Sequence, residues 1–180
     1  MDRFVVLSGC SGGGKSTLLA ELRRRGHVCV EEPGRRIIQE EARNGGQAVP
    51  WGAMAAFLRR AIDMAIADRA SATGTAGWVF FDRGLVDAAA ALEALTGEPV
   101  LAGLTRHHLY HRRVFLTPPW PEIYAPEPER RHGIEAAVAE YERLLRVYPS
   151  LGYEAVVLPK VPVTERAGLV LEALSGAPGL

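Results

Sequence analysis

Short apolar runs alternate with stretches of helical periodicity along the chain. The run 4–7 precedes glycine-rich sequence and predicts a buried strand, after which Leu18, Leu19 and Leu22 recur at helical spacing over 15–25. The alternation continues with strands predicted at 28–31, 78–81, 114–116 and 155–158. Helices are predicted at 35–43, along an apolar stripe over 54–66 that precedes a loop at 71–77, in an alanine-rich stretch that ends at Leu95, at 101–111, at 134–147, and from an N-cap at Thr164 to 174. Strands that alternate with helices form parallel sheets covered on both faces, so the pattern predicts an α/β fold.

The segment 117–131 interrupts this alternation. It contains five prolines, which exclude a regular helix or strand, and it predicts a lid or a structured loop. No internal repeat and no second composition boundary accompany it. We therefore expect a single domain over 1–180, with a lid at about 117–132.

Composition narrows the class of protein. Hydrophobic residues make up 48% of the 180 positions and charged residues 23%, which is typical of a globular domain with a core. The net charge is zero, so neither nucleic acid nor an anionic membrane is an expected partner. Two cysteines, no signal peptide and no apolar run of about 18 residues indicate a cytoplasmic protein without a membrane span.

The glycine-rich sequence after the first strand carries the strongest chemical signal. It fits G-x-x-x-x-G-K-[ST] at every fixed position and leads into a predicted helix, as a phosphate-binding loop does. Glycine amides and the helix N-terminus cradle phosphate oxygens, while the lysine neutralises them and the serine hydroxyl binds Mg²⁺. The alternative is a glycine-rich turn with Ser16 as an N-cap. The predicted nucleotide-binding residues are Gly9, Cys10, Ser11, Gly12, Gly13, Gly14, Lys15, Ser16 and Thr17.

Lysine is rare in this chain. Nineteen of the 21 basic residues are arginines, and the two lysines are Lys15 and Lys160. Lys15 occupies the fixed lysine position of the loop, where a compact ammonium fits against phosphates. Cys10 fills a variable position, and we interpret it as a small filler rather than a nucleophile.

The third apolar strand ends in an acid. Asp82 is therefore a candidate to hold Mg²⁺ with Ser16, and Arg83 has the fork of donors needed to clamp a phosphate or a substrate oxygen. The alternative makes Asp82 a helix cap and Arg83 a surface residue. Asp87 is either a substrate ligand or an acid in the first turn of the next helix.

The second strand also ends in acids. Glu31 and Glu32 fall at the carboxyl edge of the sheet, where open α/β sheets bind ligands, and strand alternation points one toward the cleft. Pro33 keeps the preceding residue extended, so Glu32 could accept the proton of a substrate hydroxyl or orient a water. A solvated loop acid is an equally good reading of either residue.

Taken in order, Gly9 to Ser16, Glu32-Pro33-Gly34-Arg35 and Asp82-Arg83-Gly84 resemble the NadR-like P-loop domains, a group of predicted ATPases of the AAA class. This group is similar to ribosylnicotinamide kinases and, more distantly, to deoxynucleoside kinases. The resemblance implies a three-layer P-loop NTPase sandwich with strand order 2-3-1-4-5 and a lid. It also implies that Glu32 acts on the acceptor hydroxyl, with Arg35 beside it at the substrate, and that Asp82 and Arg83 serve metal and substrate.

Members of the group carry an Asp before a lid arginine pair, whereas this chain has glutamates there. Arg130 and Arg131 remain candidates to stabilise the charge of a transferring phosphoryl group. ATP is favoured over GTP, because Asn44 is the only asparagine and N-K-x-D cannot occur. The base is expected against the loop that contains Lys160. His107, His108 and His111 are read either as a zinc pair or as a solvated basic face.

Two functions remain open on these residues. One is a kinase that uses Mg²⁺ and ATP to phosphorylate a hydroxyl of a small nucleoside- or riboside-like acceptor. The other is an ATPase or nucleotide-dependent switch that acts on a protein or lipid partner; homodimer formation is left open. Room beyond the γ-phosphate, lined by Glu32, Arg83 and Asp87, would favour the kinase, and a closed pocket the switch.

Overall fold

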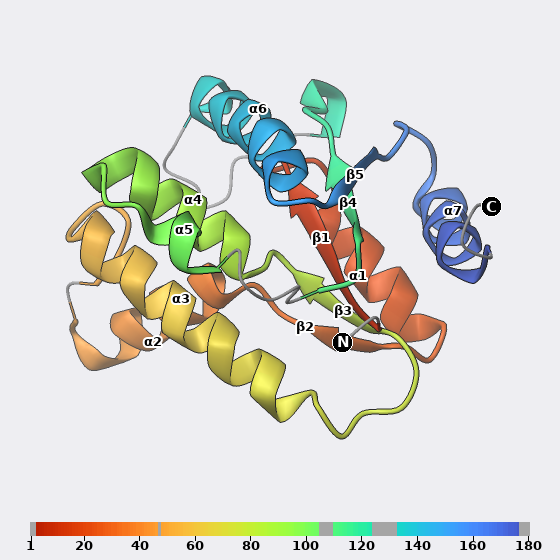
Figure 1. Cartoon of the computed structure of the whole chain (residues 1–180), viewed down its shortest axis with the longest axis horizontal. Helices are drawn as coiled ribbons and strands as arrows, with labels where there is room; N and C mark the ends of the chain where they lie inside the picture. Colours follow the sequence, from red (N-terminus) through yellow and green to blue (C-terminus); the bar gives the residue numbers. More distant parts are fainter. Residues whose placement is uncertain (1–2, 47, 105–109, 124–132, 177–180) are drawn as a thin grey trace.

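Among the residues that the computed structural model describes (3–46, 48–104, 110–123 and 133–176), five parallel strands form one sheet in the order β2-β3-β1-β4-β5 (Figure 1). This confirms the predicted fold class and strand order. The strands are β1 (Phe4–Gly9), β2 (Val28–Val30), β3 (Val79–Asp82), β4 (Arg113–Thr117) and β5 (Glu154–Val157). Central β1 is buried along its whole length, as expected for a strand covered on both faces.

Helices cover the two faces of the sheet (Figure 1). On one face lie α1 (Lys15–Arg24) and α7 (Val163–Ser175), and on the other α3 (Met54–Ser71), α4 (Leu85–Thr96) and α6 (Ile134–Ser150). Alternation along β1 supplies both cores, with Val5 and Leu7 facing α1 and α7 and Val6 facing the opposite layer. Full burial of each such side chain contributes about 1.5–3 kcal/mol.

A third apolar cluster joins α2 (Pro33–Asn44) to α3 and α4, away from the sheet. Ile37, Phe57 and Leu58 are buried in it. The remaining described elements are α5 (Val100–Leu104) and the short 3₁₀ helix η1 (Pro121–Ile123), which lies inside the segment expected to be irregular. No helix within the described ranges is both long enough and apolar enough to cross a membrane.

Several predicted boundaries were wrong for identifiable reasons. Helix α2 begins at Pro33 rather than at residue 35, because proline is tolerated in the first helical turn. Helix α7 begins at Val163 with Pro162 as its N-cap, so Thr164 lies inside the helix and does not cap it. Helix α3 ends at Ser71, where the sequence predicts a loop of small residues over 71–77.

Candidate active site

The phosphate loop is shaped by its approach to β4. A side chain on Gly13 would come within 2.7 Å of Thr117 Oγ1, and one on Gly9 would collide with the Thr117 backbone. The Cys10 amide donates to the Thr117 carbonyl over 2.8 Å. Helix α1 then begins at Lys15 with Gly14 as its left-handed N-cap, so the reading of Ser16 as an N-cap was wrong. Only glycine permits this approach without a backbone shift.

Lys15 crosses the loop with its ammonium buried. Its Nζ donates to the Cys10 carbonyl at 2.8 Å, and only 6% of the residue is exposed. Burial lowers the pKa of Lys15, and the nearby Arg83 guanidinium lowers it further, while Asp82 and Glu32 oppose the shift. A bound anion would stabilise this ammonium, as the phosphate-binding interpretation requires.

Ser16 and Asp82 form the second polar pair of the loop. The Ser16 hydroxyl donates to Asp82 Oδ2 over 3.4 Å, while Asp82 Oδ1 is buried without a hydrogen-bond partner. Burial raises the pKa of Asp82 to about 6, and the Glu32 carboxylate adds to the rise. Since α4 has Gly84 as its N-cap, the reading of Asp82 as a helix cap was wrong.

This pair fits a hard cation. Hydroxyl and carboxylate oxygens are the ligands that Mg²⁺ prefers, and an unpartnered buried carboxylate oxygen is a costly group that a cation or its water shell would satisfy. No cluster of three or more His, Cys, Asp and Glu side chains is found among the described residues. A magnesium ion held by Ser16 and Asp82 would therefore take most of its ligands from phosphate and water.

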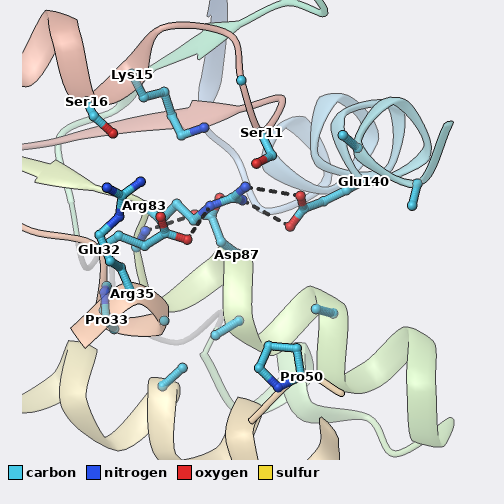
Figure 2. A pocket seen from close by; sticks show the side chains of 18 of the residues that line it. Ser11, Lys15, Ser16, Glu32, Pro33, Arg35, Pro50, Arg83, Asp87 and Glu140 are labelled. Carbon is cyan, nitrogen blue, oxygen red and sulfur yellow. Dashed lines mark hydrogen bonds and ion pairs between the residues drawn. The ribbon is translucent and has the colours of Figure 1, made fainter. Parts of the chain in front are cut away.

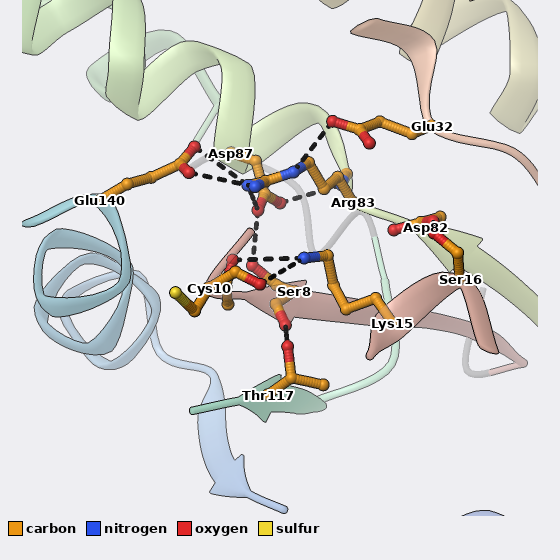
Figure 3. A network of polar contacts seen from close by, with 12 residues as sticks. Ser8, Cys10, Lys15, Ser16, Glu32, Asp82, Arg83, Asp87, Thr117 and Glu140 are labelled. Atoms are coloured by element: carbon orange, nitrogen blue, oxygen red, sulfur yellow. Dashed lines mark hydrogen bonds and ion pairs between the residues drawn. The ribbon is translucent and has the colours of Figure 1, made fainter. Parts of the chain in front are cut away.

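Arg83 lies at the centre of a charge network (Figure 3). Its backbone has φ 64°, the one positive φ of a non-glycine residue among those the structure describes. The side chain reaches Glu32 over 3.1 Å and Asp87 over 3.4 Å, and it binds both carboxylate oxygens of Glu140 at 3.0 Å. Burial opposes the charge, but these three carboxylates raise the pKa of Arg83 well above its usual value. Strained backbone held in place by side-chain contacts is typical of functional sites.

The two glutamates after β2 take opposite directions. Glu32 pairs with Arg83 and lines the cavity, whereas Glu31 is 61% exposed and pairs with Arg23 over 3.5 Å. Arg35 also lines the cavity, where its charge acts on Asp82. Both glutamates follow the end of β2 at Val30, and of the two Glu32 lines the cavity.

Asp87 is fully occupied by donors. It accepts from Ser8 at 2.5 Å, from Tyr148 at 2.6 Å and from the Gly84 amide at 2.9 Å, in addition to the Arg83 contact. It is therefore an acid of the first helical turn that also fixes the α4 start against β1 and α6. Burial and this carboxylate raise the pKa of Tyr148 well above its usual value.

Sequence reasoning missed two side chains. Glu140 on α6 holds Arg83, and Arg166 on α7 donates to the Gly13 carbonyl at 3.1 Å while its guanidinium lies 5.1 Å from the centre of the Trp120 ring. Arg166 Nε is buried without a hydrogen-bond partner, and burial lowers the pKa of Arg166. Neither residue belongs to a local motif, so no signal in the sequence marks them.

One cavity of about 830 Å³ collects most of the predicted residues (Figure 2). Its walls include Ser11, Gly12, Gly14, Lys15, Ser16, Thr17, Glu32, Arg35, Arg83 and Asp87. Gly9, Cys10, Gly13 and Asp82 are not among its lining residues, and exposed Lys160 is not either, although Val161 and Pro162 are. Arg130, Arg131, His107 and His108 lie outside the described residues, as does most of the predicted lid. His111 is described, and its ring contacts Trp78.

The sheet order, the phosphate loop and the acids at the strand ends define a P-loop domain of the kinase-like type. A family model described as an AAA domain matches residues 4–166, so the chain belongs to this family of AAA domains. None of the curated proteins matches the chain.

Solved structures with this fold include several kinases. NadR in complex with NR is 18% identical with a TM-score of 0.72, covering 98% of this chain and 52% of its own. Deoxyadenosine kinase from M. mycoides with bound dATP is 12% identical with a TM-score of 0.66, covering 96% and 100%. Shikimate kinase from Acinetobacter baumannii in complex with shikimate is 15% identical with a TM-score of 0.59, covering 96% and 92%.

Proposed function

We propose that the chain is a kinase that moves the γ-phosphate of ATP to a hydroxyl of a small nucleoside- or riboside-like acceptor. The observation that carries the proposal is the room beyond the phosphate loop. The cavity that contains Lys15 and Ser16 continues past them and is lined by Glu32, Arg83 and Asp87. A switch or plain ATPase needs no such space. The solved kinases of the same fold support the assignment.

The reaction follows from the positions of the charges. The acceptor oxygen attacks the γ-phosphorus, the bond from that phosphorus to the bridging oxygen breaks, and ADP leaves. Glu32 takes the proton of the acceptor hydroxyl, since its carboxylate lines the cavity beside the phosphate loop. Lys15 and the loop amides stabilise the negative charge of the phosphates. Mg²⁺, held by Ser16 and Asp82, supplies further charge neutralisation when bound.

Arg83 and Asp87 act mainly through their neighbours. Arg83 donates to three carboxylates, one of which is Glu32, so it fixes the orientation of the Glu32 carboxylate, the proposed general base. Asp87 is filled by other donors and holds the start of α4. We assign both residues to positioning. We assign stabilisation of the charge on the transferring phosphoryl group to Arg130 and Arg131, and contact with the adenine base of ATP to Lys160.

The test offers purified protein ATP, Mg²⁺ and a panel of nucleosides and ribosides. Phosphorylated product and ADP are both measured for Glu32→Gln and for Glu31→Gln, which changes the exposed carboxylate of the preceding residue. We expect product with the parent protein, a loss of roughly 100-fold or more in Glu32→Gln and no change in Glu31→Gln. Absence of product, with ATP turnover equal in all three, would instead favour the ATPase or switch.

A further inference from the structure

The cavity changes character beyond Glu32. Its far walls come from α2, α3 and α4, and the side chains that line it there are apolar, including Ile38, Met54, Phe57, Leu58, Ala91 and Leu95. Apart from Arg35 on α2 and Asp87 on α4, these three helices contribute no charged or amide side chain to the lining. Figure 2 shows this region across the charged residues from the phosphate loop.

The apolar wall begins immediately beside the proposed base. A methyl group placed on Gly34 would lie 3.1 Å from Phe57 Cζ and 3.5 Å from Glu32 Oε1. Both atoms therefore lie close to Gly34, and Glu32, Gly34 and Phe57 all line the cavity. A single small molecule in the cavity can then place a hydroxyl at Glu32 and an apolar ring at Phe57.

The apolar side chains of this wall can recognise a ligand by its shape but cannot form hydrogen bonds with it. Small residues at one face of α4, Ala88, Ala91 and Ala94, leave space for a ring, and Leu95 stays 53% exposed beside them. A carbonyl or amino group of a base buried here would lose its water without gaining a partner from these helices. An apolar ring would lose nothing and would cover the exposed leucine.

The charged residues of the cavity also favour an acceptor without an acidic group. Arg83 is already matched by three carboxylates, so it offers no free cation to an acidic acceptor. Arg35 lies at the start of α2, where its charge lowers the pKa of Asp82, and Arg143 lines the cavity from α6 rather than from α2, α3 or α4. A carboxylate or phosphate on the far end of the acceptor would face only apolar side chains from α2, α3 and α4.

We propose that the acceptor is a riboside-like alcohol whose aglycone is an uncharged apolar ring, recognised by shape in the wall of α2, α3 and α4. This rests on the kinase function proposed above and names its substrate class. Nucleosides whose bases carry several hydrogen-bonding groups, and acceptors with an acid on the ring, are poor substrates on this reading.

The test compares three ribosides with the same sugar: phenyl riboside, uridine and phenyl riboside with a meta-carboxylate. ADP formation and phosphorylated product are measured with ATP and Mg²⁺ for the parent chain. We expect kcat/KM for phenyl riboside to exceed that for either polar analogue by about 10- to 100-fold. Equal or better use of uridine or of the carboxylate overturns the assigned substrate class and leaves the kinase function standing.

A variant makes the test specific to the wall. Met54→Gln preserves the volume of a partly exposed side chain that lines the cavity and adds an amide, so it should raise uridine relative to phenyl riboside by several-fold. Ile66→Gln, on the same helix but 49% exposed and outside the cavity, should leave the ratio unchanged. An unchanged ratio in Met54→Gln contradicts the proposal. No product from any riboside overturns the kinase function, and the substrate class with it.

Discussion

The two ends of the cavity are built in different ways. The phosphate end is formed by the phosphate loop, a run of consecutive residues of which Ser11, Gly12 and Gly14–Thr17 line the cavity. The acceptor end is assembled from side chains that follow β2 and β3 and from side chains on α2, α3, α4 and α6, which meet only in the folded chain. The phosphate end uses backbone amides together with the fixed lysine and serine of the motif, so it carries the chemistry common to P-loop proteins. The acceptor end uses side chains, so it carries what is particular to this chain.

Two buried aspartates differ in whether their carboxylate oxygens have hydrogen-bond partners. Asp82 has one oxygen without a hydrogen-bond partner and a pKa raised to about 6, whereas Asp87 accepts from Ser8, Tyr148 and the Gly84 amide. A carboxylate that is filled stabilises the fold, and one that is left open costs stability and is available to a ligand.

The largest expected effect lies at the phosphate end. Lys15→Ala removes the buried ammonium while the loop glycines keep the backbone path, so we expect a folded protein that loses at least about 100-fold in ATP affinity. Titration with a fluorescent ATP analogue measures the affinity, and thermal unfolding checks the fold. Arg23→Ala, on the exposed side of the same helix, is the matched control. Normal ATP affinity in Lys15→Ala would remove the basis for a phosphate site.

Much of the phosphate end could be predicted from the sequence, because a contiguous motif specifies a contiguous backbone. The strand-end acids could be placed too, since parallel strands end at one edge of the sheet. Glu140 and Arg166 could not, because they come from α6 and α7 and no local pattern marks them. Helix starts at Pro33 and Val163 were missed because local capping rules allow more than one register.

A smaller effect is expected for the open aspartate, and it tests the contrast between the two aspartates. The ordinary pKa of Asp82 is 3.8 and its pKa in the folded chain is about 6, so the folded state binds the extra proton between these values. Stability contributed by this group therefore falls as pH rises from about 4 to 6, and the cost remains above that range. Asp82→Asn should raise the free energy of unfolding of nucleotide-free protein by roughly 2 kcal/mol at pH 8 and by little at pH 4.

Urea unfolding at the two pH values measures the effect, with exposed Asp63→Asn as the control. A gain of equal size at both pH values would show that ionisation is not its cause. The same variant should weaken the dependence of ATP binding on Mg²⁺, since it removes one of the two proposed magnesium residues. Stabilisation together with lost metal dependence would mark Asp82 as a group kept for function at the expense of the fold.

The smallest expected effect concerns Glu140, one of the two site residues that the sequence did not reveal. Glu140→Gln keeps the shape of the side chain but removes its negative charge, leaving Arg83 with Glu32 and Asp87. If Glu140 positions the base through Arg83, kcat for the preferred riboside should fall about tenfold, or roughly 1.4 kcal/mol, with KM for ATP nearly unchanged. Glu140→Asp should recover part of the loss. Glu142→Gln, exposed on the same helix, should behave as the parent. A purely structural Glu140 would lower unfolding temperature without the selective loss of kcat, and the acceptor end would then owe its geometry to α2, α3 and α4 alone.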